Sequence, residues 1–185
     1  MKKLVISAHP DDEVLGCGGS MAKWSSEGAE VHSLIMAEGA TSRDKSRDRE
    51  SRKADLTHLA QAAQKAGDIL GIASVNLLSY PDNRMDSVDL LDVVKYIEVQ
   101  IAKIKPEVVV THHSADLNVD HRRSFEAVIT SCRPIPNQNI KNIFSFEIPS
   151  STDWMATNRK SFEPNWFQDI SSTIDRKIEA IEACI

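Results

Sequence analysis

Cysteine is scarce in this chain, and its spacing excludes two common kinds of scaffold. The 185 residues include three cysteines, Cys17, Cys132 and Cys184, which are far apart and form no CxxC pair. An odd number of widely spaced thiols predicts neither a disulfide framework nor a zinc site built from thiolates. We therefore expect buried or half-buried thiols, and we expect any metal ion to be held by other ligands.

An excess of basic residues is also missing. Lys and Arg number 22 against 27 Asp and Glu, which gives a formal net charge of -5. Without a basic tail or an arginine-rich patch, the chain lacks the charge pattern that attracts phosphate backbones. Nucleic acid is therefore not an expected partner. The negative charge also disfavours binding to a membrane surface.

No apolar run is long enough for a signal peptide or a membrane span. The first run, in MKKLVISAH, breaks at His9, well short of the roughly 20 apolar residues that a spanning helix needs. We therefore expect a cytoplasmic protein. With 41% hydrophobic residues, a chain of this length can bury one core, so residues 1–185 are expected to fold as a single domain.

Short apolar runs alternate with amphipathic segments along the chain. The runs suited to buried strands are Leu4–Ser7, Glu30–Met36, Val75–Leu78, Glu107–Thr111 and Ile143–Phe146. The segments with helical spacing are Val14–Gly28, Lys53–Leu70, Ser87–Lys103, Arg122–Cys132 and Ser171–Ala183. This alternation predicts a Rossmann-like, doubly wound α/β fold with a mainly parallel sheet and helices on both faces. The charged stretch 38–52 is interpreted as a mobile surface loop.

Two polar clusters follow predicted strands and should meet at one edge of the sheet, where such folds bind ligands. They are HPDDE at residues 9–13 and HHSADLNVDHR at residues 112–122. Either cluster alone would also fit a solvated loop. Together they offer imidazoles and carboxylates that suit zinc held by two imidazoles and one carboxylate, and Fe(II) would accept the same set. The candidate ligands are His9, Asp11, Asp12, Glu13, His112, His113, Asp116, Asp120 and His121.

These clusters resemble the signatures of a known enzyme family. AHPDDE at residues 8–13, continued by LGCGG at 15–19, resembles the first motif of the LmbE/PIG-L deacetylases, and DLNVDHR at 116–122 resembles their second motif. The resemblance implies a zinc-dependent N-deacetylase that acts on a small-molecule substrate. Its expected reaction is removal of the acetyl group from an N-acetylated amino sugar or a conjugate of one.

The resemblance also implies roles for individual residues. His9, Asp12 and His121 fall on the family's metal ligands, and Asp11 falls on its general base. In this mechanism zinc lowers the pKa of a bound water, and Asp11 removes the proton of that water and passes one to the departing amine.

One departure from the family pattern concerns the second motif. Many members carry a histidine three residues before the last metal ligand, where this chain has Asn118. We expect His113, ahead of His112, to supply the missing imidazole from the strand end. Asp120 is expected to hold a metal-binding imidazole in orientation, as carboxylates commonly do beside metal sites.

Four residues are candidates for substrate contacts. Asn83 and Arg84 follow a predicted strand and could hydrogen-bond sugar hydroxyls or a phosphate, although a turn with an exposed arginine has the same pattern. Asn118 stands where many relatives have histidine. Trp154 is the tryptophan best placed to stack on a sugar, because it lies in a predicted loop.

Two other patterns have plainer interpretations. Arg43, Arg47 and Arg49 could reach an anionic substrate group, but a run of charges is usually a solvated face. The glycines of LGCGG lack the GxGxxG spacing of a dinucleotide-binding loop.

Two rival functions remain at this stage. The first is a catalytically silent metal-binding or sugar-binding protein, favoured by Asn118 and by a chain that ends at Ile185, earlier than the family usually does, as in a truncated domain or one completed by a partner subunit. Asp11 favours activity, since a purely structural metal site does not need it. The second rival is an amidase for a different acyl group. The sequence leaves homo-oligomerisation open.

Overall fold

A single parallel sheet forms the centre of the computed structural model, which describes residues 1–154 and 160–184. Its strands are β1 (Lys2–Ser7), β2 (Glu30–Ala37), β3 (Ser74–Tyr80), β4 (Val108–His112) and β5 (Asn142–Phe146). They lie in the order β3-β2-β1-β4-β5, and every neighbouring pair is parallel. The order reverses between β1 and β4, and in open α/β sheets the crevice at such a point is the preferred ligand site.

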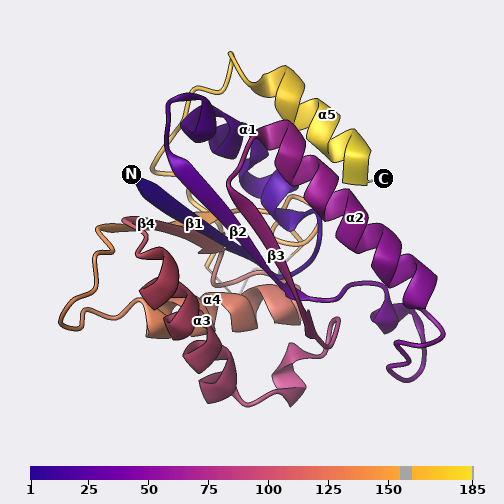
Figure 1. Cartoon of the computed structure of the whole chain (residues 1–185). Helices are drawn as coiled ribbons and strands as arrows, with labels where there is room; N and C mark the ends of the chain where they lie inside the picture. Colours follow the sequence, from indigo (N-terminus) through magenta and orange to yellow (C-terminus); the bar gives the residue numbers. More distant parts are fainter. Residues whose placement is uncertain (155–159, 185) are drawn as a thin grey trace.

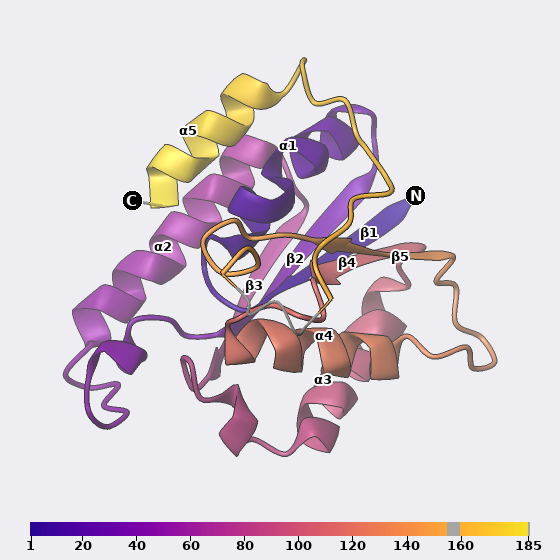
Figure 2. The same cartoon turned by 180° about the vertical axis from the view of Figure 1, so that it is seen from behind.

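Helices cover both faces of the sheet (Figures 1 and 2). One face carries α1 (Asp12–Ser26), α2 (Lys53–Leu70) and α5 (Ile174–Cys184), and the other carries α3 (Leu90–Ile104) and α4 (Val119–Ser131). Two short 3-10 turns, η1 (Thr41–Arg43) and η2 (Met85–Ser87), follow β2 and β3. Among the helices described, none is both long and apolar enough to cross a bilayer.

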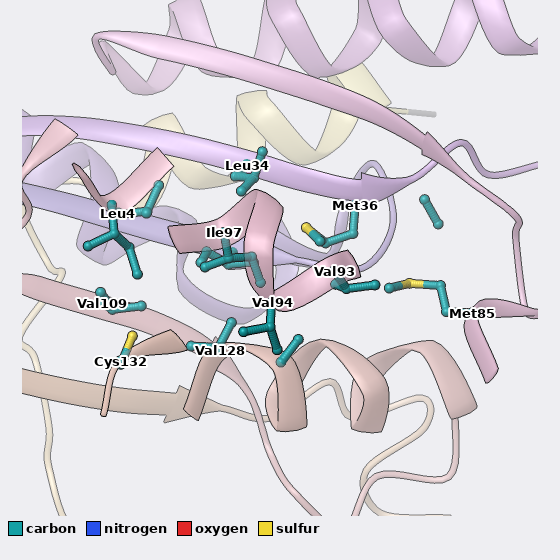
Figure 3. Close-up of a cluster of buried hydrophobic side chains, with 14 residues drawn as sticks. Leu4, Leu34, Met36, Met85, Val93, Val94, Ile97, Val109, Val128 and Cys132 are labelled. Atoms are coloured by element: carbon teal, nitrogen blue, oxygen red, sulfur yellow. The ribbon is translucent and has the colours of Figure 1, made fainter. Parts of the chain in front are cut away.

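The strands alternate their side chains between two hydrophobic clusters. Leu4 and Ile6 of β1 belong to the cluster beneath α3 and α4, whereas Val5 belongs to the cluster beneath α1, α2 and α5. Figure 3 shows the first cluster, in which Val94 and Ile97 of α3 lie over the sheet. Because each fully buried aliphatic side chain contributes about 1.5–3 kcal/mol, the two clusters fix both the register of the strands and the edge at which their carboxyl ends meet.

The glycines of LGCGG allow α1 to pack closely against its neighbours. A Cβ atom on Gly16 would lie 2.3 Å from the ring of Phe146, and one on Gly19 would lie 2.5 Å from Ile170. Real Cβ atoms do not approach neighbours so closely, so these positions require glycine for packing. The motif is explained without a nucleotide.

The predicted fold is confirmed, with several differences in detail. β3 is longer than its predicted apolar run, and α4 begins at Val119 rather than Arg122. The early start of α4 has a local cause: Asn118 caps the helix by accepting a hydrogen bond from the backbone N–H of Asp120. The stretch 38–52 is also more than a surface loop, because Glu38 and Thr41 are buried.

Candidate metal and catalytic site

Both polar clusters lie at the carboxyl ends of β1 and β4, on either side of the point where the strand order reverses. His9 follows β1, and Asp12 is the first residue of α1. His112 ends β4, and His121 lies in the first turn of α4. Parallel pairing of β1 with β4 therefore brings together residues more than 100 positions apart in sequence.

Asp12 is the centre of the cluster. Its side chain is buried, and its Oδ2 accepts a hydrogen bond of 2.8 Å from the backbone N–H of His9. The same oxygen lies 3.3 Å from Nδ1 of His9 and 3.2 Å from Nε2 of His121. Burial alone would raise the pKa of Asp12, but the surrounding imidazoles hold the pKa of this carboxyl well below its ordinary value.

The far nitrogen of His9 is held by a second buried carboxylate. Nε2 of His9 lies 3.0 Å from Oδ2 of Asp120, which is fully buried. Asp120 also accepts hydrogen bonds from the backbone N–H groups of Asn83 (2.6 Å) and Met85 (2.9 Å). The expectation that Asp120 orients an imidazole matches this geometry, and the imidazole is that of His9.

The far nitrogen of His121 is held by a different aspartate. Nδ1 of His121 lies 3.2 Å from Oδ2 of Asp116, a fully buried residue. That oxygen also accepts hydrogen bonds from the hydroxyls of Ser151 (3.0 Å) and Thr152 (2.7 Å). The sequence placed Asp116 in the cluster without a role, and no motif pointed to the two hydroxyls.

The residues fit a divalent metal ion. One nitrogen of each imidazole and one oxygen of Asp12 lie within 4.8 Å of one another, and the remaining nitrogens contact buried carboxylates, as in proteins whose histidines bind metal. Although burial opposes it, contacts with Asp12 and Asp120 raise the pKa of His9 to about 10, and contacts with Asp116 and Asp12 raise that of His121 to about 9. The cluster thus needs positive charge beside Asp12, which protons or a divalent cation can supply.

A second group of ligand atoms involves the same histidine. His9, Asp82 and Asp120 also offer atoms within 4.8 Å of one another. Both oxygens of Asp120 already accept backbone N–H groups, and Oδ2 of Asp82 accepts the backbone N–H of Ser42. We therefore interpret this second group as support for His9 and for the adjoining turns.

Asp11 differs from the neighbouring Asp12 in backbone and in exposure. Its φ is 117°, a conformation that non-glycine residues rarely adopt and that proteins hold mostly at functional sites. The residue is half-buried, whereas Asp12 is buried. Burial, together with the charge of Asp12, raises the pKa of Asp11 to about 6, which suits a group that exchanges protons near neutrality.

Glu13, the last residue of the HPDDE cluster, differs from Asp12 in the direction of its pKa shift. It is buried, and its Oε2 accepts a 3.2 Å hydrogen bond from the hydroxyl of Ser7. Burial raises its pKa to about 8, so the carboxyl is largely protonated at neutral pH.

The structure brings His112, and not His113, into the cluster. His112 is fully buried, its Nε2 lies 3.4 Å from Oδ2 of Asp12, and burial lowers its pKa to about 3. His113 lies nearer the surface, where its Nε2 is 3.0 Å from the carbonyl oxygen of Lys160 and its ring meets that of Phe162 edge-on. The difference arises because β4 extends one residue further than its predicted end.

Of the predicted substrate residues, Asn83 and Asn118 lie beside the cluster. Asn83 is exposed, and its Oδ1 accepts a 2.9 Å hydrogen bond from Nδ2 of Asn118. Arg84 instead donates to the carbonyl oxygens of Asp44 (3.2 Å) and Lys45 (3.5 Å), so it ties the loop after β2 to the turn after β3. Trp154 lies on the surface with 76% of its area exposed.

Two of the loop arginines have internal partners. Arg47 binds the carboxylate of Glu38 through two hydrogen bonds of 2.7 and 2.9 Å, and Arg49 contacts it at 2.7 Å. These guanidinium groups neutralise a buried acid, which explains their charge without an anionic substrate.

Comparison with known proteins gives a consistent family. Residues 4–132 match the family described as PIG-L, GlcNAc-PI de-N-acetylase. The chain is similar to the uncharacterized deacetylase YaiS of Escherichia coli (strain K12), with 30% identity over 172 residues that cover 90% of this chain and 80% of YaiS.

Solved structures share the fold. The N,N'-diacetylchitobiose deacetylase of Pyrococcus horikoshii has a TM-score of 0.76 at 23% identity, covering 99% of this chain and 69% of its own. GalB of Pseudomonas putida KT2440, a 4-carboxy-2-hydroxymuconate hydratase, also has a TM-score of 0.76, at 24% identity, with 99% and 78% covered. At these identities the likeness shows the fold alone. The match across residues 4–132 and the identity to YaiS show that the chain belongs to the PIG-L family of de-N-acetylases.

Proposed function

We propose that this chain is a metal-dependent hydrolase that removes the acetyl group from an N-acetylated amino sugar or a conjugate of one. The observation that carries the proposal is the paired arrangement around Asp12. His9 and His121 each face Asp12 with one nitrogen and contact a buried aspartate with the other. A carboxylate–imidazole pair of this kind fixes the tautomer and the direction of a metal-binding nitrogen.

His9, Asp12 and His121 would hold the metal ion. Two imidazoles and one carboxylate are the donors of many catalytic zinc sites, and Fe(II) accepts the same set. A bound zinc ion would lower the pKa of a water and polarise the amide carbonyl. Asp120 and Asp116 would keep the two imidazoles in place while the substrate enters and the products leave.

Asp11 would act as the proton carrier. Its carboxylate takes a proton from the attacking water, and the same group then donates a proton to the amine as the carbon–nitrogen bond breaks. Its half-buried side chain and its unusual φ of 117° support this role. Acetate and a free amino sugar are the products.

Asn83 and Asn118 are the best-placed candidates for contacts to sugar hydroxyls. They are hydrogen-bonded to each other, and the backbone N–H of Asn83 is bound to Asp120, so both amides sit close to His9. Trp154 remains a candidate stacking surface because of its exposure. We place Arg84 in the support of the adjoining loop rather than against the substrate.

The family, rather than the fold, supports the choice of reaction. The hydratase GalB has the same fold, so the fold alone does not distinguish amide hydrolysis from a hydration reaction. De-N-acetylation is the reaction named for the matched family. The strands described form one sheet, which supports the further proposal that residues 1–185 are one domain.

The test is release of primary amine from a panel of N-acetylglucosamine derivatives by zinc-loaded protein. We expect turnover by the wild type and background rates for Asp11→Asn and His121→Ala. His58→Ala is the control, because His58 is an exposed residue of α2 far from the strand ends in sequence. Asp11→Asn should still bind stoichiometric zinc, whereas His121→Ala should not.

The outcomes separate the rival functions. Stoichiometric zinc without amine release from any acetylated sugar would favour a silent binder or an amidase for another acyl group. Absence of metal binding by the wild type, measured by elemental analysis after dialysis against zinc, would overturn the proposal.

A further inference from the structure

His112 has an environment that the proposed reaction does not explain. It ends β4, it is fully buried, and it lies in the middle of the cluster without being one of the three proposed ligands. Its Nδ1 is buried and has no hydrogen-bond partner among the residues described. Because a buried polar atom without a partner is costly, an unsatisfied group of this kind calls for an explanation.

The other ring nitrogen of His112 has a partner that fixes its state. The backbone N–H of Ala8 donates to Nε2 at 2.8 Å. A backbone N–H can only donate, so Nε2 must carry its lone pair and any ring proton must be on Nδ1. A proton on Nε2 would set two donors against each other. The geometry therefore requires an uncharged imidazole at this position.

The same ring also lies flat on a proposed metal ligand. The rings of His112 and His121 are stacked, with centroids 3.9 Å apart and an angle of 15° between their planes. Phe146 of β5 packs against His112 at 4.7 Å and 60°. His112 thus restricts the position of His121, while Asp116 fixes the rotation of that ring.

We propose that His112 is a positioning residue that aligns both metal-binding histidines. Its Nε2 holds the main chain at Ala8, directly before His9, and its ring face supports His121. The inference rests on the metal site proposed above. An uncharged ring suits this place, since a further positive charge would repel a cation bound at Asp12.

Two substitutions separate the two contacts. His112→Phe keeps an aromatic face but removes the acceptor for Ala8, and His112→Gln keeps an acceptor but removes the ring. Substitution of a residue that orients a metal ligand typically lowers metal affinity by about 10–100-fold. We expect zinc affinity to fall by about that factor in His112→Phe and by less in His112→Gln.

The experiment measures zinc affinity by competition with a chromophoric chelator, and ligand geometry by the visible spectrum of the cobalt-substituted protein. Far-UV circular dichroism and thermal unfolding of the metal-free variants show whether each is folded at the temperature of the titration. His58→Phe is the matched control. His113→Phe makes the same change at the adjacent histidine. If His112→Phe does not fold, His112→Gln carries the test, and its cobalt spectrum should differ from that of the wild type.

Each outcome gives a decision. Weaker zinc binding and an altered cobalt spectrum in folded His112 variants, with His58→Phe unchanged, would support the inference. Wild-type affinity and spectrum in the folded His112 variants, or a larger loss in His113→Phe, would overturn it while leaving the metal site intact. If the wild type binds neither ion, the proposed metal site fails and the inference fails with it.

Discussion

In each half of the candidate metal site, a buried aspartate contacts one of the two proposed metal-binding histidines. The two halves differ in the groups that donate hydrogen bonds to that aspartate. On one side, Asp120 contacts His9 and accepts the backbone N–H groups of Asn83 and Met85. On the other side, Asp116 contacts His121 and accepts two hydroxyl groups. Main-chain donors are fixed by the fold, whereas hydroxyls rotate and can find other acceptors.

This difference suggests a division between a rigid half and an adaptable half. Asp120 connects α4 to the turn after β3 and to His9, so three segments depend on one buried carboxylate. Asp116 accepts the backbone N–H of Asn118 only two residues away, and its longer-range partners are the side chains of Ser151 and Thr152. The site on the His9 side should therefore tolerate less change.

The largest effect is expected where the two halves meet. Asp12→Ala removes the carboxylate that both imidazoles share. We expect stoichiometric zinc binding to be lost and amine release to fall to background. Elemental analysis and the amine assay measure both quantities. Zinc retained at one ion per chain would show that Asp12 is not a ligand.

The difference between the two halves is tested by replacing each supporting aspartate with alanine. In Asp120→Ala, two backbone N–H groups lose their acceptor, and each buried group left unpaired costs about 1–3 kcal/mol. In Asp116→Ala, one backbone N–H group, that of Asn118, loses its acceptor and the hydroxyls can reorient, so we expect a smaller loss, about 1–3 kcal/mol in total. Urea unfolding of the metal-free proteins measures the difference. Equal destabilisation of the two variants would remove the distinction between rigid and adaptable halves.

The sequence was informative about the sheet and about the metal ligands for separate reasons. Buried parallel strands appear as short apolar runs such as Val108–Val110, so their positions were predictable. The family motif assigned His9, Asp12 and His121, and the parallel topology placed them at one edge. The structure brings these three side chains together, and their roles remain proposals.

Other features could not be obtained from local patterns. Ser151 and Thr152 reach Asp116 from a segment more than 30 residues away, and no spacing rule connects them. The choice between His112 and His113 depended on where β4 ends. Because side chains alternate along a strand, His112 has the parity of Val108 and Val110, which face α1. Because the predicted strand ended at Thr111, His112 was not included in this alternation.

Metal removal is expected to lower thermal stability by an amount that differs among these variants. A ligand present at 100 times its dissociation constant stabilises the folded state by about 2.7 kcal/mol, and a tenfold loss of affinity removes about 1.4 kcal/mol. We expect a chelator to lower the thermal midpoint of the wild type, to lower it less in Asp116→Ala and Asp120→Ala, and to leave Asp12→Ala unchanged. A chelator effect that persists in Asp12→Ala would place the stabilising ion elsewhere.

The smallest effect is expected at the hydroxyls of the adaptable half. Ser151 donates to Asp116 at 3.0 Å and lies 3.4 Å from Nδ1 of His121. Thr152 donates to Asp116 at 2.7 Å and also accepts the backbone N–H of Ile148. Ser151→Ala removes one of the two hydroxyl donors to the Asp116 carboxylate and leaves the other in place, whereas Thr152→Val also leaves a main-chain donor unpaired. We therefore expect Thr152→Val to be the less stable of the two in urea unfolding, with zinc affinity in Ser151→Ala close to that of the wild type. A loss of zinc affinity in Ser151→Ala as large as in Asp116→Ala would mean that the hydroxyl, rather than the carboxylate, holds His121.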